Sequence, residues 1–305
     1  MIIIGVWVGL LAWAGLTAWN KVGRVDAIPT DSQVPAGKGT NVLLVGSDSR
    51  AGLTSAQAKA LRTGGSNITG KRTDSIMVLH MPSSGEPTLV SLPRDTYVPI
   101  PGHRSNKINA AFSFGPKVLV QTVENVTGLR IDHYMEIGFG GFAGIVDSVG
   151  GVRMCLPKAM NDSFAHINLP AGCQNLAGAN ALGYVRSRHT DATSDLARVK
   201  RQREFLSALT KKIASPGNLL LPWKLKSVGS SGAEGLAVEN GMHSWTALNI
   251  LWTLKKIGSG GNSVQVPIAD ANYSTPAGSA VLWDKAKARA LFSALNEDRS
   301  PNVAP

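Results

Sequence analysis

The chain has 305 residues and carries 31 Lys and Arg against 20 Asp and Glu, a net charge of +11, with 43% hydrophobic residues. This length suffices for one large domain or two small ones, and the hydrophobic content excludes a chain too polar to bury a core. The positive charge indicates an anionic partner such as nucleic acid, phospholipid or a phosphorylated substrate, and it does not choose among them. A basic surface that only keeps the protein soluble is the alternative.

The first segment, residues 2–20, is predicted to be a transmembrane helix. Ile2–Trp19 contains no charged residue, and its 18 apolar or small residues are just enough to span a bilayer. A cleaved signal peptide is the main alternative, but the segment lacks a basic start and a clear small-x-small cleavage site. Lys21 and Arg24 follow the segment, which by the positive-inside rule opposes export of the rest. We therefore expect a native start upstream, with a basic cytoplasmic segment.

The rest of the chain alternates between strand and helix patterns. Residues 21–39 are rich in Pro, Gly and small polar residues and are predicted to be a linker. The predicted strands are 41–45, 75–81, 88–92, 152–156 and 181–188. The predicted helices are 116–125, 139–149, 195–213 with Asp195 as the N-cap, 245–257 and 280–295. This alternation predicts an α/β domain over residues 40–300.

The two cysteines of the chain are Cys155 and Cys173. A pair that closes a short loop is typical of exported proteins, so we expect a disulfide and an oxidising compartment. Two unrelated buried thiols are the alternative. A metal site is disfavoured because no further cysteine accompanies the pair.

Charged residues stand at the ends of three predicted strands. Asp48 follows the first strand in GSDSR, and Arg72 and Asp74 precede the second in KRTDS. Arg94 and Asp95 follow the third in LPRDTY. If these strands are antiparallel neighbours, the charged side chains meet at one edge of the sheet. Two carboxylates there suit Mg²⁺, which commonly takes one or two carboxylates plus substrate phosphates, whereas turn chemistry explains any single motif equally well.

A second basic group lies in the C-terminal half. With residues 181–188 as a strand, alternation puts Arg186 and Arg188 on one face, where the charges repel unless an anion lies between them. Arg198 falls in the first turn of the next helix, where the dipole favours an anionic ligand, and Gln202 lies one turn further on the same face. These side chains are predicted to bind phosphate. Three further basic residues of this helix are interpreted as a solvated face: Lys200, Arg201 and Arg203.

Together these motifs resemble the LytR-CpsA-Psr family of phosphotransferases, in particular its actinobacterial branch. The resemblance runs in order through GSDSR, RTDSIMVL, SLPRDTYV, KINAAFSFG, VDSVGGV and LGYVRSRH with DLARVKRQREFL, within residues 40–215. It implies a three-layer α/β/α sandwich with a central mixed sheet, placed outside the cell membrane and anchored by a single transmembrane helix. It also implies transfer of a phospho-glycan, arabinogalactan in that branch, from a polyprenyl-pyrophosphate lipid to a hydroxyl of peptidoglycan.

The resemblance assigns roles to the residues that match its motifs. Asp48 and Asp74 would hold Mg²⁺, with Mn²⁺ as a substitute. The pyrophosphate would be held by Arg72, Arg94, Lys107, Arg186, Arg188, Arg198 and Gln202. The expected catalytic residues are Arg94, Asp95, Arg186 and Arg188. Asp95 is a candidate base, with a structural carboxylate paired to arginine as the alternative. The candidates for the wall of a prenyl tunnel, or for plain core, are Phe142, Ile145, Val146 and Val149.

Other function classes fit parts of the sequence. A polyprenyl-pyrophosphate binding protein would use the same residues without turnover, and a pyrophosphate hydrolase would use water in place of the acceptor hydroxyl. A nucleic-acid binder is disfavoured because the arginines lie beside carboxylates and no basic patch is interleaved with aromatic residues. The sequence contains no GxxxxGK[ST] loop and no GxSxG elbow, which argues against the enzymes that those motifs mark.

Overall fold

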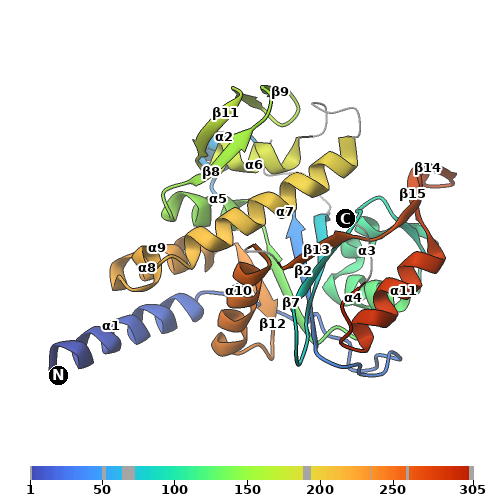
Figure 1. The fold of residues 1–305 in the computed structure, drawn as a ribbon. Coiled ribbons are helices and arrows are strands. Elements are labelled where there is room, and N and C mark those ends of the chain that lie inside the picture. The colour runs from blue at the N-terminus through green and yellow to red at the C-terminus, as the bar shows by residue number, and fades with distance from the viewer. Residues whose placement is uncertain are drawn as a thin grey trace.

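The computed structural model of the protein describes residues 2–49, 53–63, 73–187, 194–233, 235–258 and 261–301. In this part of the chain, seven strands form a mixed central sheet that lies between helices (Figure 1). In order across the sheet, the strands are β1 (Gly23–Val25), β12 (Leu236–Glu239), β7 (His133–Ile137), β2 (Thr40–Ser47), β3 (Thr73–Met81), β4 (Thr88–Leu92) and β13 (Asn262–Gln265). The parallel pairs are β1 with β12, β7 with β2, and β4 with β13, and the other neighbours are antiparallel.

Neighbouring side chains of β2 enter two separate cores, one on each face of the sheet. Leu43 packs in a cluster with Leu119 and Phe292, whereas Val42 packs in another with Ile250. The helices of the first face are α3 (Ile108–Ala111), α4 (Pro116–Thr127) and α11 (Lys285–Asn296), and those of the second are α7 (Ser194–Ile213) and α10 (Ser244–Gly258). This arrangement confirms the predicted α/β fold with a central mixed sheet.

A third cluster of apolar side chains lies beyond one end of the sheet (Figure 1). It is built from α5 (Phe139–Ser148), β8 (Val152–Leu156), β9 (Met160–Asp162), β10 (Ile167–Leu169), β11 (Gly172–Leu176), α6 (Gly178–Arg186) and one side of α7. Val146 and Val149 are buried in this cluster and Phe142 and Ile145 pack against it, so these residues form ordinary core. A disulfide joins Cys155 of β8 to Cys173 of β11, which are direct partners in the antiparallel pair.

Two of the predicted elements are wrong. The strand predicted over residues 181–188 is wrong, because residues 181–186 are helical and belong to α6. Ala181, Tyr184 and Val185 all contact the same buried cluster, which is the i, i+3, i+4 spacing of one helix face. The strand alternation that paired Arg186 with Arg188 therefore does not apply, and Arg188 lies outside the described residues.

The second wrong element is the single helix over residues 280–295. The chain first forms β15 (Gly278–Trp283), which pairs with β14 (Ile268–Thr275), and only then α11. Asp284 separates the two, since its side chain caps α11 by accepting a hydrogen bond from the Lys287 amide at 3.1 Å. The long helix α7 begins at Ser194, one residue before the predicted cap Asp195. The predicted linker contains the short strand β1, which joins the sheet.

The remaining described elements are α1 (Ile2–Trp19), α2 (Ser55–Ala60), β5 (Tyr97–Val98), β6 (Asn106–Lys107), the 3-10 helix η1 (Phe112–Phe114), α8 (Pro216–Leu219) and α9 (Pro222–Ala233). Helix α1 covers the apolar N-terminal segment and packs along α9. No helix within the described residues is long and apolar enough to cross a membrane, so the transmembrane prediction for residues 2–20 finds no support there.

The disulfide gives a prediction about stability. Replacing both cysteines by serine in C155S/C173S removes a cross-link between residues 18 apart in sequence, which should lower the free energy of unfolding by about 3 kcal/mol. Urea denaturation of the two proteins measures this difference. Thiol labelling of the unreduced wild-type protein should fail, and two reactive thiols before reduction would contradict the assignment.

Candidate functional site

Three antiparallel strands bring their charged ends to one edge of the central sheet. The last residue of β2, Ser47, is paired with Thr73 at the start of β3, and Ile76 of β3 is paired with Leu92 at the end of β4. Asp48 therefore leaves the sheet where Asp74 enters it. The sequence predicted this convergence from the strand ends alone, and the register of the sheet agrees with it.

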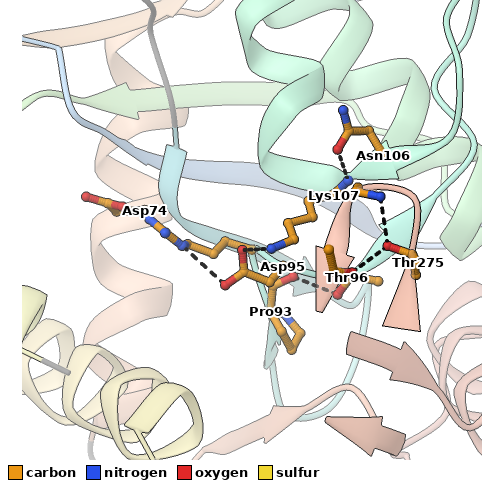
Figure 2. Close-up of polar contacts among 10 residues, drawn as sticks. Asp74, Pro93, Asp95, Thr96, Asn106, Lys107 and Thr275 are labelled. Atoms are coloured by element: carbon orange, nitrogen blue, oxygen red, sulfur yellow. Dashed lines mark hydrogen bonds and ion pairs between the residues drawn. The ribbon is translucent and has the colours of Figure 1, made fainter. Parts of the chain in front are cut away.

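A chain of ion pairs runs along this edge. The guanidinium of Arg94 forms an ion pair with Asp74, and its Nε lies 3.5 Å from Oδ2 of Asp95. The Nζ of Lys107 lies 3.7 Å from Oδ1 of the same carboxylate. Figure 2 shows Asp74, Asp95 and Lys107 in this arrangement, with Lys107 reaching over from β6. Asp95 therefore lies between two cations, as expected for a structural carboxylate paired to arginine.

A cavity of about 210 Å³ opens next to Asp74 and Arg94. It is lined by Asp74, Arg94, Asp162, Phe164, Ala165, Arg186 and Arg198. Four of these residues were predicted from the sequence, and they come from strands and helices far apart in the chain. The cavity thus combines three guanidinium groups with two carboxylates, a set that suits an anion with several phosphate oxygens.

Two of the cavity arginines are held by their surroundings. Arg198 of α7 is only 2% exposed, so its long side chain lies inside the protein. Arg186 is in the last turn of α6, where a cation is favoured by the helix dipole, and its Cζ lies 4.6 Å from the ring centroid of Phe139. Phe139 is itself buried at the start of α5. The contact with Phe139 orients the guanidinium group of Arg186, and burial confines the side chain of Arg198, before any ligand arrives, which lowers the cost of ordering them on binding.

Gln202 and Arg201 contact the backbone at the end of α6. The amide of Gln202 donates to the carbonyl of Val185 at 3.1 Å, and Nη2 of Arg201 donates to the carbonyl of Ser187 at 2.6 Å. Gln202 is not among the residues that line the cavity, and its role as a pyrophosphate ligand stays a prediction. The interpretation of Arg201 as a solvated residue is wrong, since only 7% of it is exposed.

Asp162 is the main residue of the site that the sequence interpretation missed. Its Oδ1 accepts from the amides of Phe164 and Ala165 at 3.0 and 3.1 Å, and its Oδ2 accepts from the hydroxyl of Ser187 at 2.8 Å. One buried carboxylate thus joins the β9–β10 turn to the residue that follows Arg186. The only signal in the sequence is the polar run Asn161-Asp162-Ser163, which is typical of a turn and says nothing of a cavity.

A buried polar network lies under the end of β2 that carries Asp48. Glu136 accepts hydrogen bonds from the hydroxyl groups of Ser47 at 2.7 Å and of Tyr134 at 3.0 Å. Burial and the neighbouring Glu136 carboxylate raise the pKa of Tyr134 well above its ordinary value, so the phenol stays a hydrogen-bond donor. The network fixes the strand end from which Asp48 leaves the sheet.

In the described part of the chain, the predicted metal ligands Asp48 and Asp74 do not belong to a larger group of metal-binding side chains. Among the described residues, no three His, Cys, Asp or Glu side chains form a group that could hold a metal ion. Asp48 and Asp74 remain a donor pair of the kind that Mg²⁺ accepts when substrate phosphates complete its shell. Arg72 and Arg188 lie outside the described residues.

Comparison with known proteins identifies the family of the chain. Residues 19–268 match the model of the LytR_cpsA_psr family. "Probable cell wall biosynthesis protein LcpB" of Corynebacterium glutamicum is 50% identical over 278 residues, covering 90% of this chain and 65% of the relative. "Cell wall biosynthesis protein LcpA" of the same organism is 32% identical over 285 residues, covering 79% of this chain and 54% of the relative. The chain thus spans no more than about two thirds of either relative.

Solved structures share the fold. The "LytR-Csp2A-Psr enzyme from Actinomyces oris" matches with a TM-score of 0.69 and 23% identity, covering 92% of this chain and 97% of that one. A structure titled "TagT bound to LI-WTA" matches with a TM-score of 0.63 and 22% identity, covering 91% and 98%. The family match extends over most of the chain and includes every cavity residue named above, and this chain therefore belongs to the LytR_cpsA_psr family.

Proposed function

We propose that this protein transfers a phospho-glycan from a polyprenyl-pyrophosphate lipid to a hydroxyl group of peptidoglycan. The observation that carries the proposal is the cavity in which Arg94, Arg186 and Arg198 converge beside Asp74. A pyrophosphate diester concentrates negative charge on oxygens that arginine forks match well. Phosphoryl transfer depends mainly on positioning and charge stabilisation, which such a cavity supplies without a nucleophilic side chain.

The names of relatives support the same reaction class. A Bacillus subtilis relative that is 33% identical over 196 residues is called "Polyisoprenyl-teichoic acid--peptidoglycan teichoic acid transferase TagV". By analogy, the donor here would be a glycan on a polyprenyl carrier and the acceptor would be peptidoglycan. Since LcpA and LcpB belong to Corynebacterium, arabinogalactan is our proposed glycan. No nucleic-acid partner is proposed.

In the proposed reaction, the acceptor hydroxyl oxygen attacks the phosphorus atom that carries the glycan. A new phosphorus–oxygen bond forms to peptidoglycan, the bond to the polyprenyl phosphate breaks, and the hydroxyl proton is released. Arg186 and Arg198 would stabilise the charge that develops on the phosphate oxygens, and Arg94 would position Asp74. Mg²⁺ or Mn²⁺ held by Asp48 and Asp74 would neutralise further phosphate charge.

The proposed location is the outer side of the cell membrane, with membrane lipid as a direct partner because the donor itself is a lipid. The disulfide between Cys155 and Cys173 supports an oxidising compartment. We propose a single-pass anchor near the N-terminus on the basis of the apolar composition of Ile2–Trp19.

The metal proposal predicts the behaviour of two carboxylate variants. Asp48→Asn and Asp74→Asn should each abolish Mg²⁺-stimulated release of polyprenyl phosphate, because an amide is a poor ligand for a hard cation. Asp270→Asn, at an exposed carboxylate of β14, is the control and should keep full activity. Release is measured by thin-layer chromatography of a labelled lipid donor. Full Mg²⁺-stimulated activity in both test variants would contradict the metal role, and release without acceptor would favour a hydrolase.

The cavity arginines predict a binding defect. Arg186→Ala and Arg198→Ala should each weaken binding of a short-chain polyprenyl pyrophosphate by about 1.5–3 kcal/mol, roughly one to two powers of ten in Kd. Arg→Lys at either position should rescue little, because an ammonium group cannot grip two oxygens. Binding is measured by calorimetry, and the control is Lys200→Ala, which changes an exposed residue of α7, the helix that carries Arg198. Equal small effects in all three alanine variants would contradict a specific pyrophosphate site and indicate only a diffuse basic surface.

Asp162 predicts a defect of positioning. Asp162→Asn and Ser187→Ala weaken the bridge between the β9–β10 turn and the end of α6, so kcat should fall about tenfold, as expected for one hydrogen bond to a charged group. Ser163→Ala changes an exposed neighbour and should have no effect. Circular dichroism checks that the variants are folded. Wild-type kcat in folded Asp162→Asn would show that the bridge does not position the arginine.

A further inference from the structure

The outward face of α10 is apolar, unlike that of an ordinary surface helix. Trp245, Leu248 and Trp252 are 78%, 52% and 50% exposed, and their spacing of three and four residues places them on one face. The opposite face of the helix is already buried, since Ile250 and Leu254 pack in the core beside the sheet. A helix on the surface of a soluble domain normally turns polar side chains to water. The exposed tryptophans therefore indicate an interaction surface.

This surface is edged by positive charge and carries no negative charge. The Nζ of Lys255 lies 4.3 Å from the ring centroid of Trp252, and Lys256 is exposed one residue further. The sequence of α10, SWTALNILWTLKKIG, contains no Asp or Glu. Tryptophan and leucine flanked by lysine is the composition of helices that lie in the interface of an anionic bilayer.

The surface continues toward the apolar N-terminal helix. Arg24, just after α1, donates to the carbonyl of Met242 at 2.8 Å and lies 4.6 Å from the ring centroid of Trp19. This contact places the end of α1 beside the turn that precedes α10 (Figure 1). Exposed tryptophans also occur where α1 meets α9, since the rings of Trp7 and Trp223 are 5.8 Å apart.

The pair α1 and α9 repeats the combination of tryptophan and lysine. The Nζ of Lys226 lies 4.6 Å from the ring centroid of Trp13, and α9, like α1, contains no acidic residue. The surface of α10 and the surface of the pair α1 and α9 thus both combine exposed tryptophan with lysine. A flat partner with an apolar interior and an anionic surface could bind both.

We propose that the outward face of α10 docks on the surface of a bilayer that contains anionic lipid. The side chains of Trp245, Leu248 and Trp252 enter the boundary between head groups and acyl chains, and Lys255 and Lys256 contact lipid phosphates. A second copy of the chain is a poorer occupant. In a two-fold symmetric dimer this face would meet itself, and α10 offers no Asp or Glu to pair with the lysines of the other copy. The docking requires no catalytic turnover, so it can be tested independently of the proposed reaction.

A site-specific probe in the full chain tests this docking. The two cysteines are joined in the disulfide, so Leu248→Cys introduces a single free thiol for an environment-sensitive fluorophore. Vesicles of phosphatidylcholine with phosphatidylglycerol, with and without doxyl-labelled lipid, are compared with vesicles of phosphatidylcholine alone. Phe114→Cys is the matched control, because it replaces an exposed aromatic residue that is linked to α3 and α4 on the opposite face of the sheet.

The expected result is a blue shift and doxyl quenching for the probe at position 248 on anionic vesicles, and neither change at position 114. Lys255→Gln and Lys256→Gln should each weaken docking at position 248 about fivefold, since a lysine near an anionic surface contributes about 1 kcal/mol. An unchanged probe at position 248, or equal quenching at both positions, would overturn the proposal. A shift that appears without lipid and grows with protein concentration would assign the face to a second copy instead.

Discussion

The ion pair between Arg94 and Asp74 joins the ends of β3 and β4, and the candidate site is arranged around it. An arginine beside a cavity that holds other arginines is repelled unless a carboxylate compensates its charge. Asp74 provides that compensation at the sheet edge, where the antiparallel register leaves no freedom to place it elsewhere. The pair also orients the guanidinium group, whose other side lies near Asp95. A ligand with several anionic oxygens would complete the charge balance of the cavity.

The other half of the cavity depends on how the end of α6 is held. Arg186 is the last residue of α6, and Arg198 lies near the start of α7. Asp162 and Arg201 hold the end of α6 through the hydroxyl and the carbonyl of Ser187. Buried polar groups that are satisfied in this way specify one arrangement, because any other would leave them without partners.

Helix α7 connects the cavity with the aromatic surface of α10. Arg198 faces the cavity at one end of the helix, and Leu206, two turns later, packs in the cluster that lies under α10. A bilayer bound to the outward face of α10 would therefore contact a helix that packs directly against α7, the element that carries Arg198. For an enzyme whose proposed donor is a membrane lipid, this connection would fix the orientation of the cavity relative to its source of substrate.

The sequence alone identified the family of the chain and the charged strand ends that meet at the candidate site. The ends of β2, β3 and β4 were predictable because apolar runs define strands, and antiparallel order then brings Asp48, Asp74 and Arg94 to one edge. The order of residues along the chain, however, does not give the distances between their side chains in the folded protein. That Asp162 lines the cavity was decided by the tertiary structure, in which its carboxylate accepts a hydrogen bond from Ser187 just after α6, where the predicted strand proved to be a helix. A helix rotates each side chain by about 100° per residue and a strand by about 180°. Which of these two rotations applies to a short segment such as Gly178–Arg186 depends on the side chains that bury it, and these come from distant parts of the chain.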